Sequence, residues 1–230
     1  MFILEALGVT NKVGYPRAYD HVIQDLATKQ QTGDKTWVAT IVNTDHSSGT
    51  GIHYNYCRYG LDENSVPRAL FLEPYRNRKL SAHMVKALKA EIPEARTRHY
   101  GTGVQKARDN YSCGYITTYW AAVGYDGNTD ICDPSTPPKG WEDVVLRLMD
   151  ASDMLADDNR VRASDIGLKP MFAQALGTGV FQASEFISQI DNFIEEYADT
   201  REVNTTHHKS HCTSSSMMMC LRCPEPCWWE

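Results

Sequence analysis

Three short apolar segments, separated by loops too short to hold a crossover helix, constrain the fold more than any other feature of the sequence. Trp37–Val42, Ile52–Tyr59 and Ala69–Leu72 are rich in β-branched and aromatic residues, which is typical of strands. Turn-forming residues fill Asn43–Gly51 and Gly60–Pro67 between them. Because parallel neighbours need a crossover of about a dozen or more residues, we expect these three strands to form an antiparallel meander.

The segments on either side of the meander are predicted to be mostly helical. Residues 1–35 are expected to be irregular except for a short helix at Ala18–Ala27. Hydrophobic periodicity after the meander predicts one further strand, Glu94–Tyr100, and the helices Leu80–Ala90, Cys113–Val123, Trp141–Leu155, Met171–Leu176 and Gln182–Tyr197. This combination indicates an α+β fold.

A chain of 230 residues suits one domain with an appendage. We expect a single domain over residues 1–200, with its core motifs at 35–123 and a helical elaboration at 140–200. Residues 201–230 are expected to form a flexible tail rich in cysteine and histidine.

The cysteine count and the apolar runs bear on the compartment. Seven cysteines, an odd number, do not resemble a secreted disulfide scaffold, so we expect a reducing compartment. The longest uncharged run, Tyr111–Tyr125, is too short and too polar for a bilayer. The N-terminus lacks a basic segment and reaches Glu5 before a sustained apolar run. We therefore expect no membrane span and no signal peptide.

The tail contains residue types that bind zinc. Its candidate ligands are Cys212, Cys220, Cys223, Cys227, His207, His208 and His211. Their spacing provides only one close cysteine pair of the usual kind, Cys220 and Cys223, and no second pair. We therefore expect no metal site, and no cofactor is expected elsewhere.

The net charge of −6 hides an uneven distribution of charge. Residues 76–108 contain nine Lys/Arg and two Glu, whereas residues 114–230 contain eight Lys/Arg and eighteen Asp/Glu. The basic stretch suits weak contact with DNA or with an acidic partner. It is equally compatible with a solvated helix face beside a loop.

The junction before the Cys113–Val123 helix carries the main candidate for chemistry. A cysteine at a helix start meets unpaired backbone N–H groups and the positive end of the helix dipole, which favour the thiolate. Gly114 allows a substrate backbone to approach closely. By itself, the junction is also compatible with a small buried residue at the start of a core helix.

A cysteine hydrolase also needs a base, an orienting carboxylate and an oxyanion donor. His53 falls within the second predicted strand and Glu73 at the end of the third, so the two can meet if these strands are neighbours. Gln105 offers a side-chain amide a few residues before Cys113. Each residue also has an ordinary interpretation: packing for His53, and plain surface or loop for Glu73 and Gln105.

Three blocks of sequence, in order, resemble the adenain family, the cysteine endopeptidases of adenoviruses with relatives in virophages, Maverick/polinton elements and large DNA viruses. The first block runs from Ala39 to Thr44 and on through Gly51-Ile52-His53-Tyr54. The second is Leu70-Phe71-Leu72-Glu73-Pro74-Tyr75. The third is Gly103-Val104-Gln105 with Ser112-Cys113-Gly114. The resemblance covers roughly residues 35–123.

The resemblance implies a papain-like domain in which a nucleophile helix packs on a mostly antiparallel sheet, with extra C-terminal helices. It implies Cys113 as nucleophile, His53 as general base and then acid, Glu73 as the group orienting His53, and Gln105 as an oxyanion donor. The implied activity is endopeptidase cleavage of virion or capsid precursor proteins, in the virion and the infected cell.

The chain departs from the family in several places. Tyr54 stands where the family has Trp, and the interval from Gln105 to Cys113 is about one residue longer than usual. No cysteine lies between Pro74 and Ser112, so we expect no activation through a disulfide-linked peptide. The negative net charge of the whole chain also disfavours a DNA cofactor.

Two other functions fit the same residues. Ulp-type deconjugases of SUMO-like or ubiquitin-like modifiers and Yop-type effectors share this constellation, usually with Asp in the carboxylate place. A binding or virion protein with an inactive site is the second alternative.

Overall fold

The computed structural model describes residues 2–9, 17–48, 53–76, 78–109, 111–124, 135–156 and 161–211, with side chains described up to residue 198. It forms two compact units, Met1–Asp191 and Asn192–Glu230. The first unit contains the sheet and most helices, and the second begins within the last helix.

The strands and helices occur in a mixed order along the chain. The strands are β1 (Arg17–Ala18), β2 (Val38–Asn43), β3 (Tyr54–Leu61), β4 (Pro67–Glu73) and β5 (Arg96–Gly101). The helices are α1 (Phe2–Ala6), α2 (Tyr19–Thr32), α3 (Ala82–Glu91), α4 (Cys113–Val123), α5 (Trp141–Leu155), a 3₁₀ turn (Ala163–Ile166), α6 (Leu168–Thr178) and α7 (Ala183–His211). The α+β class is therefore confirmed.

The five strands form one sheet in sequence order, β1-β2-β3-β4-β5. The central pairs β2–β3 and β3–β4 are antiparallel, as the short connections predicted. The edge strands β1 and β5 pair in parallel with β2 and β4. The sheet is thus mostly antiparallel, and α3 makes the crossover from β4 to β5.

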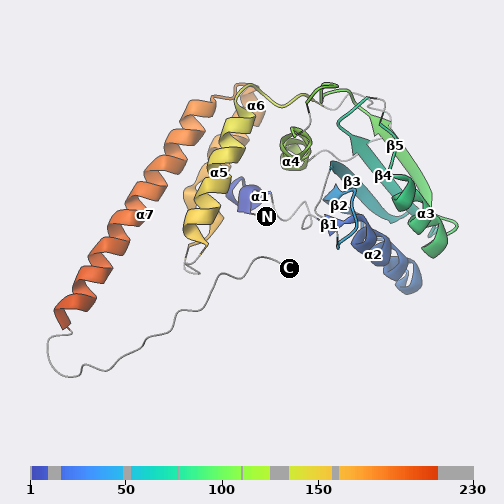
Figure 1. Cartoon of the computed structure of the whole chain (residues 1–230), viewed down its shortest axis with the longest axis horizontal. Coiled ribbons are helices and arrows are strands. Elements are labelled where there is room, and N and C mark those ends of the chain that lie inside the picture. The colour runs from blue at the N-terminus through green and yellow to red at the C-terminus, as the bar shows by residue number, and fades with distance from the viewer. Residues whose placement is uncertain are drawn as a thin grey trace. The chain divides into compact units, whose positions relative to one another are not determined.

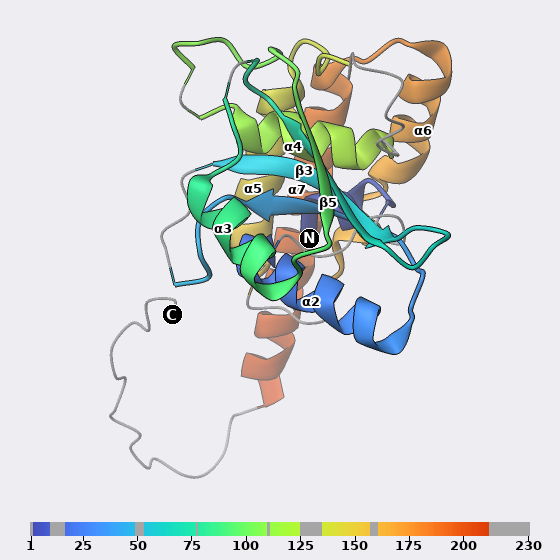
Figure 2. The same cartoon turned by 90° about the vertical axis from the view of Figure 1, so that its right-hand side faces the viewer.

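The sheet is covered on both faces (Figures 1 and 2). Helices α2 and α3 share a core with the sheet, built from residues such as Leu26, Tyr59, Phe71 and Leu88. Helix α4 packs against β3 and β2 and lies on the other side of the sheet in Figure 1. Its own apolar side, which includes the fully buried Trp120, explains why α4 occupies an interior position.

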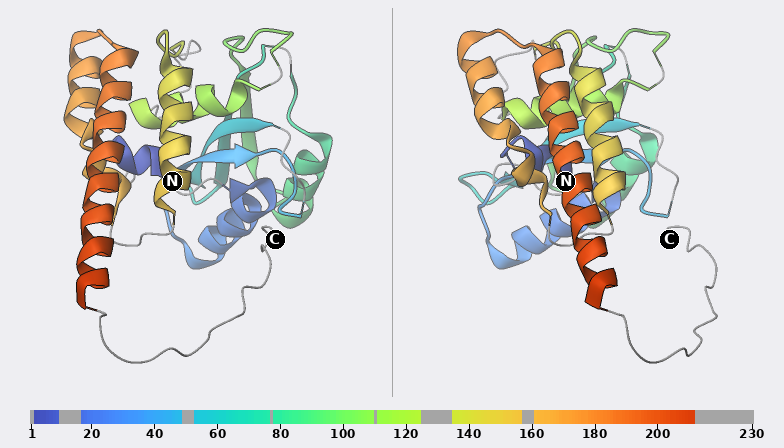
Figure 3. Two further views of the ribbon diagram at one scale, coloured as in Figure 1. Left: turned by 60° about the vertical axis from the view of Figure 1, so that its left-hand side comes forward. Right: turned by 90° about the vertical axis from the view of Figure 1, so that its left-hand side faces the viewer.

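Trp141, the first residue of α5, ties the C-terminal helices of this unit to α4. It is 1% exposed, its indole Nε1 donates to the carbonyl of Tyr115 at 2.9 Å, and its ring packs against Tyr119, Phe172 and Phe181. Removing such a side chain costs about 3–5 kcal/mol. Helix α1 also contacts α5, as Figure 3 shows.

Several predicted boundaries differ from the structure. The prediction that residues 1–35 are mostly irregular is wrong, because α1 and the full 14 residues of α2 lie there. Helix α6 is likewise longer than the predicted Met171–Leu176. Buried residues lie beyond the predicted limits at Lys29 in α2 and at Leu168 in α6, so tertiary packing extends each helix at that end.

The C-terminal prediction is tested only in part of its length. Helix α7 continues to His211, so residues 201–211 of the expected tail are helical. Cys212, Cys220, Cys223 and Cys227 lie outside the described residues. The expected domain limits and tail therefore remain predictions.

Candidate active site

Antiparallel pairing of β3 with β4 brings His53 next to Glu73. Tyr56 pairs with Leu72, so the start of β3 lies beside the end of β4. His53 precedes β3 by one residue instead of lying within the strand as predicted. Its Nε2 is 2.7 Å from Glu73 Oε1, and its carbonyl accepts the backbone N–H of Thr44 at 2.9 Å. Thr44, directly after β2, and Glu73, at the end of β4, therefore hold His53 in place.

Glu73 is 1% exposed, and hydrogen bonds satisfy both of its carboxylate oxygens. Oε1 also accepts the backbone N–H of Tyr75 at 2.9 Å, and Oε2 accepts Asn55 Nδ2 at 3.2 Å. A buried charge is tolerable only with such partners. These bonds fix the orientation of the carboxylate that faces His53.

The imidazole of His53 is held between Glu73 and Cys113. Because Nε2 faces Glu73, Nδ1 is the nitrogen left for the Cys113 thiol. Burial alone lowers the pKa of His53, but its hydrogen bonds with Cys113 and Glu73 outweigh burial and raise the pKa above its usual value. The Tyr75 ring stacks on the imidazole at a centroid distance of 5.6 Å.

Cys113 is the first residue of α4 and is 5% exposed. Burial raises the pKa of its thiol, but the hydrogen bond with His53 and those from the backbone N–H groups of Tyr54 and Gly114 outweigh burial, so the pKa falls below its usual value. Cys57 is the contrasting case, because complete burial raises the pKa of its thiol well above the usual value. Between these two cysteines, only Cys113 lies where the thiolate is stabilised.

Gln105 lies buried on the loop between β5 and α4. Its backbone N–H donates to the Pro74 carbonyl at 3.0 Å, and its Nε2 donates to the Asp109 carbonyl at 2.8 Å. That second bond fixes which end of the amide is NH₂ and leaves one of its two N–H groups for another acceptor. Its Oε1 is buried without a hydrogen-bond partner among the described residues.

Asp109 organises the loop between Gln105 and Cys113. Its carbonyl accepts both Gln105 Nε2 and the hydroxyl of Tyr75, and its Oδ1 accepts the backbone N–H groups of Ser112 at 3.0 Å and Tyr111 at 3.2 Å. Burial works against the charged form of this carboxyl, but the hydrogen bonds from Ser112 outweigh it and lower its pKa. Asp109 therefore links the residues just before the nucleophile to the candidate oxyanion donor.

Sequence reasoning missed Asn55, Tyr75 and Asp109 as members of this site. Asn55 had a detectable signal, since residues two apart in extended backbone point to the same face. Tyr75 directly follows the Glu73-Pro74 pair, and Asp109 is a turn-forming acid just before a helix start. None of these signals is specific enough to assign a role without coordinates.

This arrangement is suited to nucleophilic chemistry. A raised His53 pKa together with a lowered Cys113 pKa favours a thiolate beside an imidazolium. The positive N-terminal end of α4 adds to the stabilisation of negative charge at Cys113. Within the described parts of the chain, no group of His, Cys, Asp and Glu could hold a metal ion.

Comparison with known proteins yields partial structural similarities only. No protein-family model matches the chain, and no curated protein matches it. Solved structures that match in part include AvrA delL154 with IP6 and CoA (15% identity, TM-score 0.42, 53% of this chain and 46% of AvrA). HopZ1a in complex with IP6 matches with 16% identity and a TM-score of 0.40, over 64% of this chain and 46% of HopZ1a. The Xanthomonas campestris effector protein XopD bound to ubiquitin matches with 13% identity and a TM-score of 0.36. The match covers 59% of this chain and 77% of XopD.

The chain spans less than half the length of the first two of these structures. All three TM-scores are below 0.5, so these partial similarities assign no function to the chain. Among the described residues, no helix is both long and apolar enough to cross a membrane.

Proposed function

We propose that this protein is a cysteine peptidase that uses Cys113, His53 and Glu73. The observation that carries the proposal is the buried series Glu73–His53–Cys113, in which each group changes the protonation of the next. A histidine that only packs in a core does not need a buried carboxylate that is itself held by two further donors, Tyr75 and Asn55. A purely structural thiol does not have a lowered pKa. Both features match what thiol catalysis requires.

The proposed reaction follows from the positions of these groups. The Cys113 thiolate attacks the scissile carbonyl carbon, and the oxyanion accepts the backbone N–H of Cys113 and the free N–H of Gln105. The His53 imidazolium gives its proton to the leaving amine as the C–N bond breaks. Water, deprotonated by His53, then hydrolyses the thioester and frees Cys113. Glu73 holds the ring and stabilises its positive form.

The direct test is cleavage of a proteome-derived peptide library by the full chain, with products identified by mass spectrometry. Cys113→Ala should abolish cleavage, and Cys57→Ala is the matched control because Cys57 is buried away from a base. Equal cleavage by wild type and Cys113→Ala would overturn the proposal.

The biological substrate we propose is a virion or capsid precursor protein, processed within the virion and the infected cell. The support is the order of the three sequence blocks and the use of Glu73 followed by Pro74. Incubation with candidate capsid precursors should give discrete fragments with wild type and none with Cys113→Ala. Contact with DNA through the basic stretch 76–108 remains a secondary proposal.

The competing function is deconjugation of a ubiquitin-like modifier, or transfer of an acyl group to a protein amine. Both share the thioester formed at Cys113, so the triad does not separate them from peptide hydrolysis. Ubiquitin and SUMO probes that carry a C-terminal electrophile test the deconjugation function. Rapid labelling of Cys113 by either probe would favour deconjugation, and indifference to both would count against it.

A further inference from the structure

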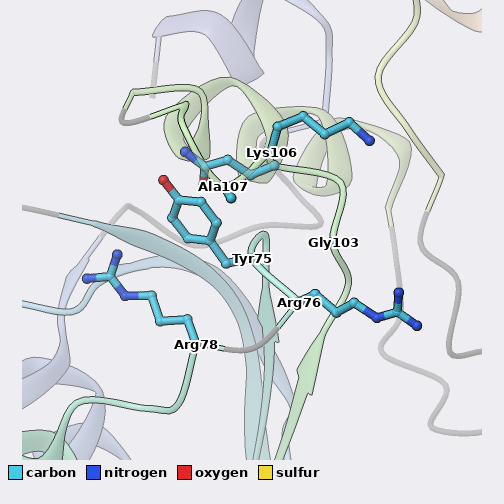
Figure 4. A pocket seen from close by; sticks show the side chains of 7 residues that line it. Tyr75, Arg76, Arg78, Gly103, Lys106 and Ala107 are labelled. Carbon is cyan, nitrogen blue, oxygen red and sulfur yellow. The ribbon is translucent and has the colours of Figure 1, made fainter.

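A pocket of about 480 Å³ opens beside the candidate site, lined by Tyr75, Arg76, Arg78, Gly103, Gln105, Lys106 and Ala107. Three of its seven lining residues are basic and none is acidic. Figure 4 shows Arg76 and Arg78 extending to opposite sides of the Tyr75 ring, with Lys106 and Ala107 across from them. This concentration of positive charge contrasts with the net charge of −6 for the whole chain.

The pocket is continuous with the catalytic groups. Tyr75 lines it and stacks on His53, and Gln105 lines it and is the candidate oxyanion donor. The Arg78 guanidinium carbon lies 5.8 Å from the Tyr75 ring centroid. A peptide whose scissile carbonyl lies at Cys113 can therefore place a neighbouring side chain in this pocket.

The walls of the pocket are fixed by backbone hydrogen bonds between its two loops. The N–H of Thr102 donates to the Glu73 carbonyl at 2.8 Å, and that of Gln105 donates to the Pro74 carbonyl at 3.0 Å. The stem of Arg76 packs on Gly103, where an added Cβ would lie 3.2 Å from the Arg76 Cβ. A preformed pocket binds its ligand without an ordering cost for the backbone.

The cations of the pocket are available to a ligand. Arg76, Arg78 and Lys106 are exposed, and among the described residues no carboxylate lies within ion-pair distance of any of them. The nearest acid along the loop, Asp109, uses its carboxylate to bind the N–H groups of Tyr111 and Ser112. Each of these cations, a guanidinium fork or an ammonium group, can pair with a carboxylate.

We propose that this pocket is a specificity subsite that binds an acidic side chain, Asp or Glu, close to the scissile bond of the peptide substrate. The subsite rests on the proposed peptidase function and adds to it a substrate class. The local positive field would also steer acidic segments to a protein that otherwise repels them.

The test compares cleavage-site sequences from the peptide library for wild type and for the double variant Arg78→Glu/Lys106→Glu. Wild type should enrich Asp and Glu at one position near the cut. In matched peptides, Glu over Gln at that position should raise kcat/KM about three- to tenfold. The double variant should instead prefer Lys. The control Lys86→Glu/Lys89→Glu, which makes the same charge change at two exposed positions of α3, should keep the wild-type preference.

Each preference is the ratio of kcat/KM values for two peptides measured with the same variant. A general loss of activity in the double variant therefore cancels in this ratio. Added salt should reduce the ratio because the cations are exposed. Cleavage with no acidic preference, or an unchanged preference in the double variant, would overturn the subsite and leave the peptidase intact. Absence of any Cys113-dependent cleavage by wild type would overturn the peptidase and the subsite together.

Discussion

His53 Nε2 and Glu73 Oε1 lie 2.7 Å apart, and each residue is at most 2% exposed. The pair depends on one feature of topology, the antiparallel register that puts the start of β3 beside the end of β4. Because Glu73 also accepts from Asn55 and Tyr75, the carboxylate cannot rotate away without leaving buried donors unpaired. The imidazole is therefore oriented before any substrate binds.

We expect Glu73→Gln to lower kcat/KM by on the order of 10²–10⁴-fold, because the variant keeps the shape of Glu73 but loses the charge that stabilises imidazolium. Steady-state cleavage of one library-derived peptide measures the effect. Glu63→Gln, the same change at an exposed site in the β3–β4 turn, is the control. Activity of Glu73→Gln within a few-fold of wild type would contradict a catalytic role for the pair.

The pH dependence of Cys113 alkylation should report the thiolate. Since its pKa is lowered, the rate should rise with pH at an inflection below that of an ordinary thiol. His53→Ala removes the hydrogen bond and the charge that lower this pKa, so its inflection should move to higher pH. Iodoacetamide labelling is read by mass spectrometry on the Cys113 peptide, because the chain has six other cysteines.

His83→Ala, on the exposed side of α3, is the matched control and should leave the inflection unchanged. An inflection at the same pH in wild type and His53→Ala would show that His53 does not stabilise the thiolate.

Asp109 should act as a positioning residue. Asp109→Ala removes the oxygen that accepts from Tyr111 and Ser112, so we expect kcat to fall by about tenfold or more with KM little changed. Asp109→Asn keeps an oxygen at that position and should recover most of the kcat. Equal kcat values for Ala and Asn variants would argue against this positioning role.

The meander and the α5 helix were predictable because local pattern and tertiary environment agree there. Helix α5 has the predicted limits, Trp141 and Leu155, since its apolar face is continuous and packed along its length. The edge strands β1 and β5 pair in parallel, and parallel pairing depends on distant segments. Of these two strands, only β5 was predicted, as Glu94–Tyr100. Strand β1 has just two residues, too few to show a hydrophobic pattern.

The site was partly readable for the same reason. His53, Glu73 and Cys113 are marked by residue type and by their places at element ends, so order along the chain was informative. Asn55, Tyr75 and Asp109 act through hydrogen bonds and stacking, which depend on backbone positions that residue type does not encode. The exposed cations of the pocket appeared in the sequence only as part of the basic stretch 76–108.

Gly101, the last residue of β5, should be the most sensitive glycine beside the site. An added Cβ would lie 2.0 Å from the Arg76 carbonyl oxygen. Hydrogen bonds from Thr102 to Glu73 and from Gln105 to Pro74 hold the two loops together on either side of this contact. We therefore expect Gly101→Ala to lower the free energy of unfolding by about 1–3 kcal/mol. It should also weaken catalysis, because the loops carrying Tyr75 and Gln105 must separate.

Gly177 in α6 provides the contrast, since nothing lies within 4 Å of its added Cβ. Gly177→Ala should raise the free energy of unfolding by up to about 1 kcal/mol through helix propensity, with unchanged peptide cleavage. Urea unfolding of both variants measures the difference. Similar free energies of unfolding for Gly101→Ala and Gly177→Ala would show that the end of β5 and the loop after β4 can move apart at little cost. That result would contradict the close packing at Gly101.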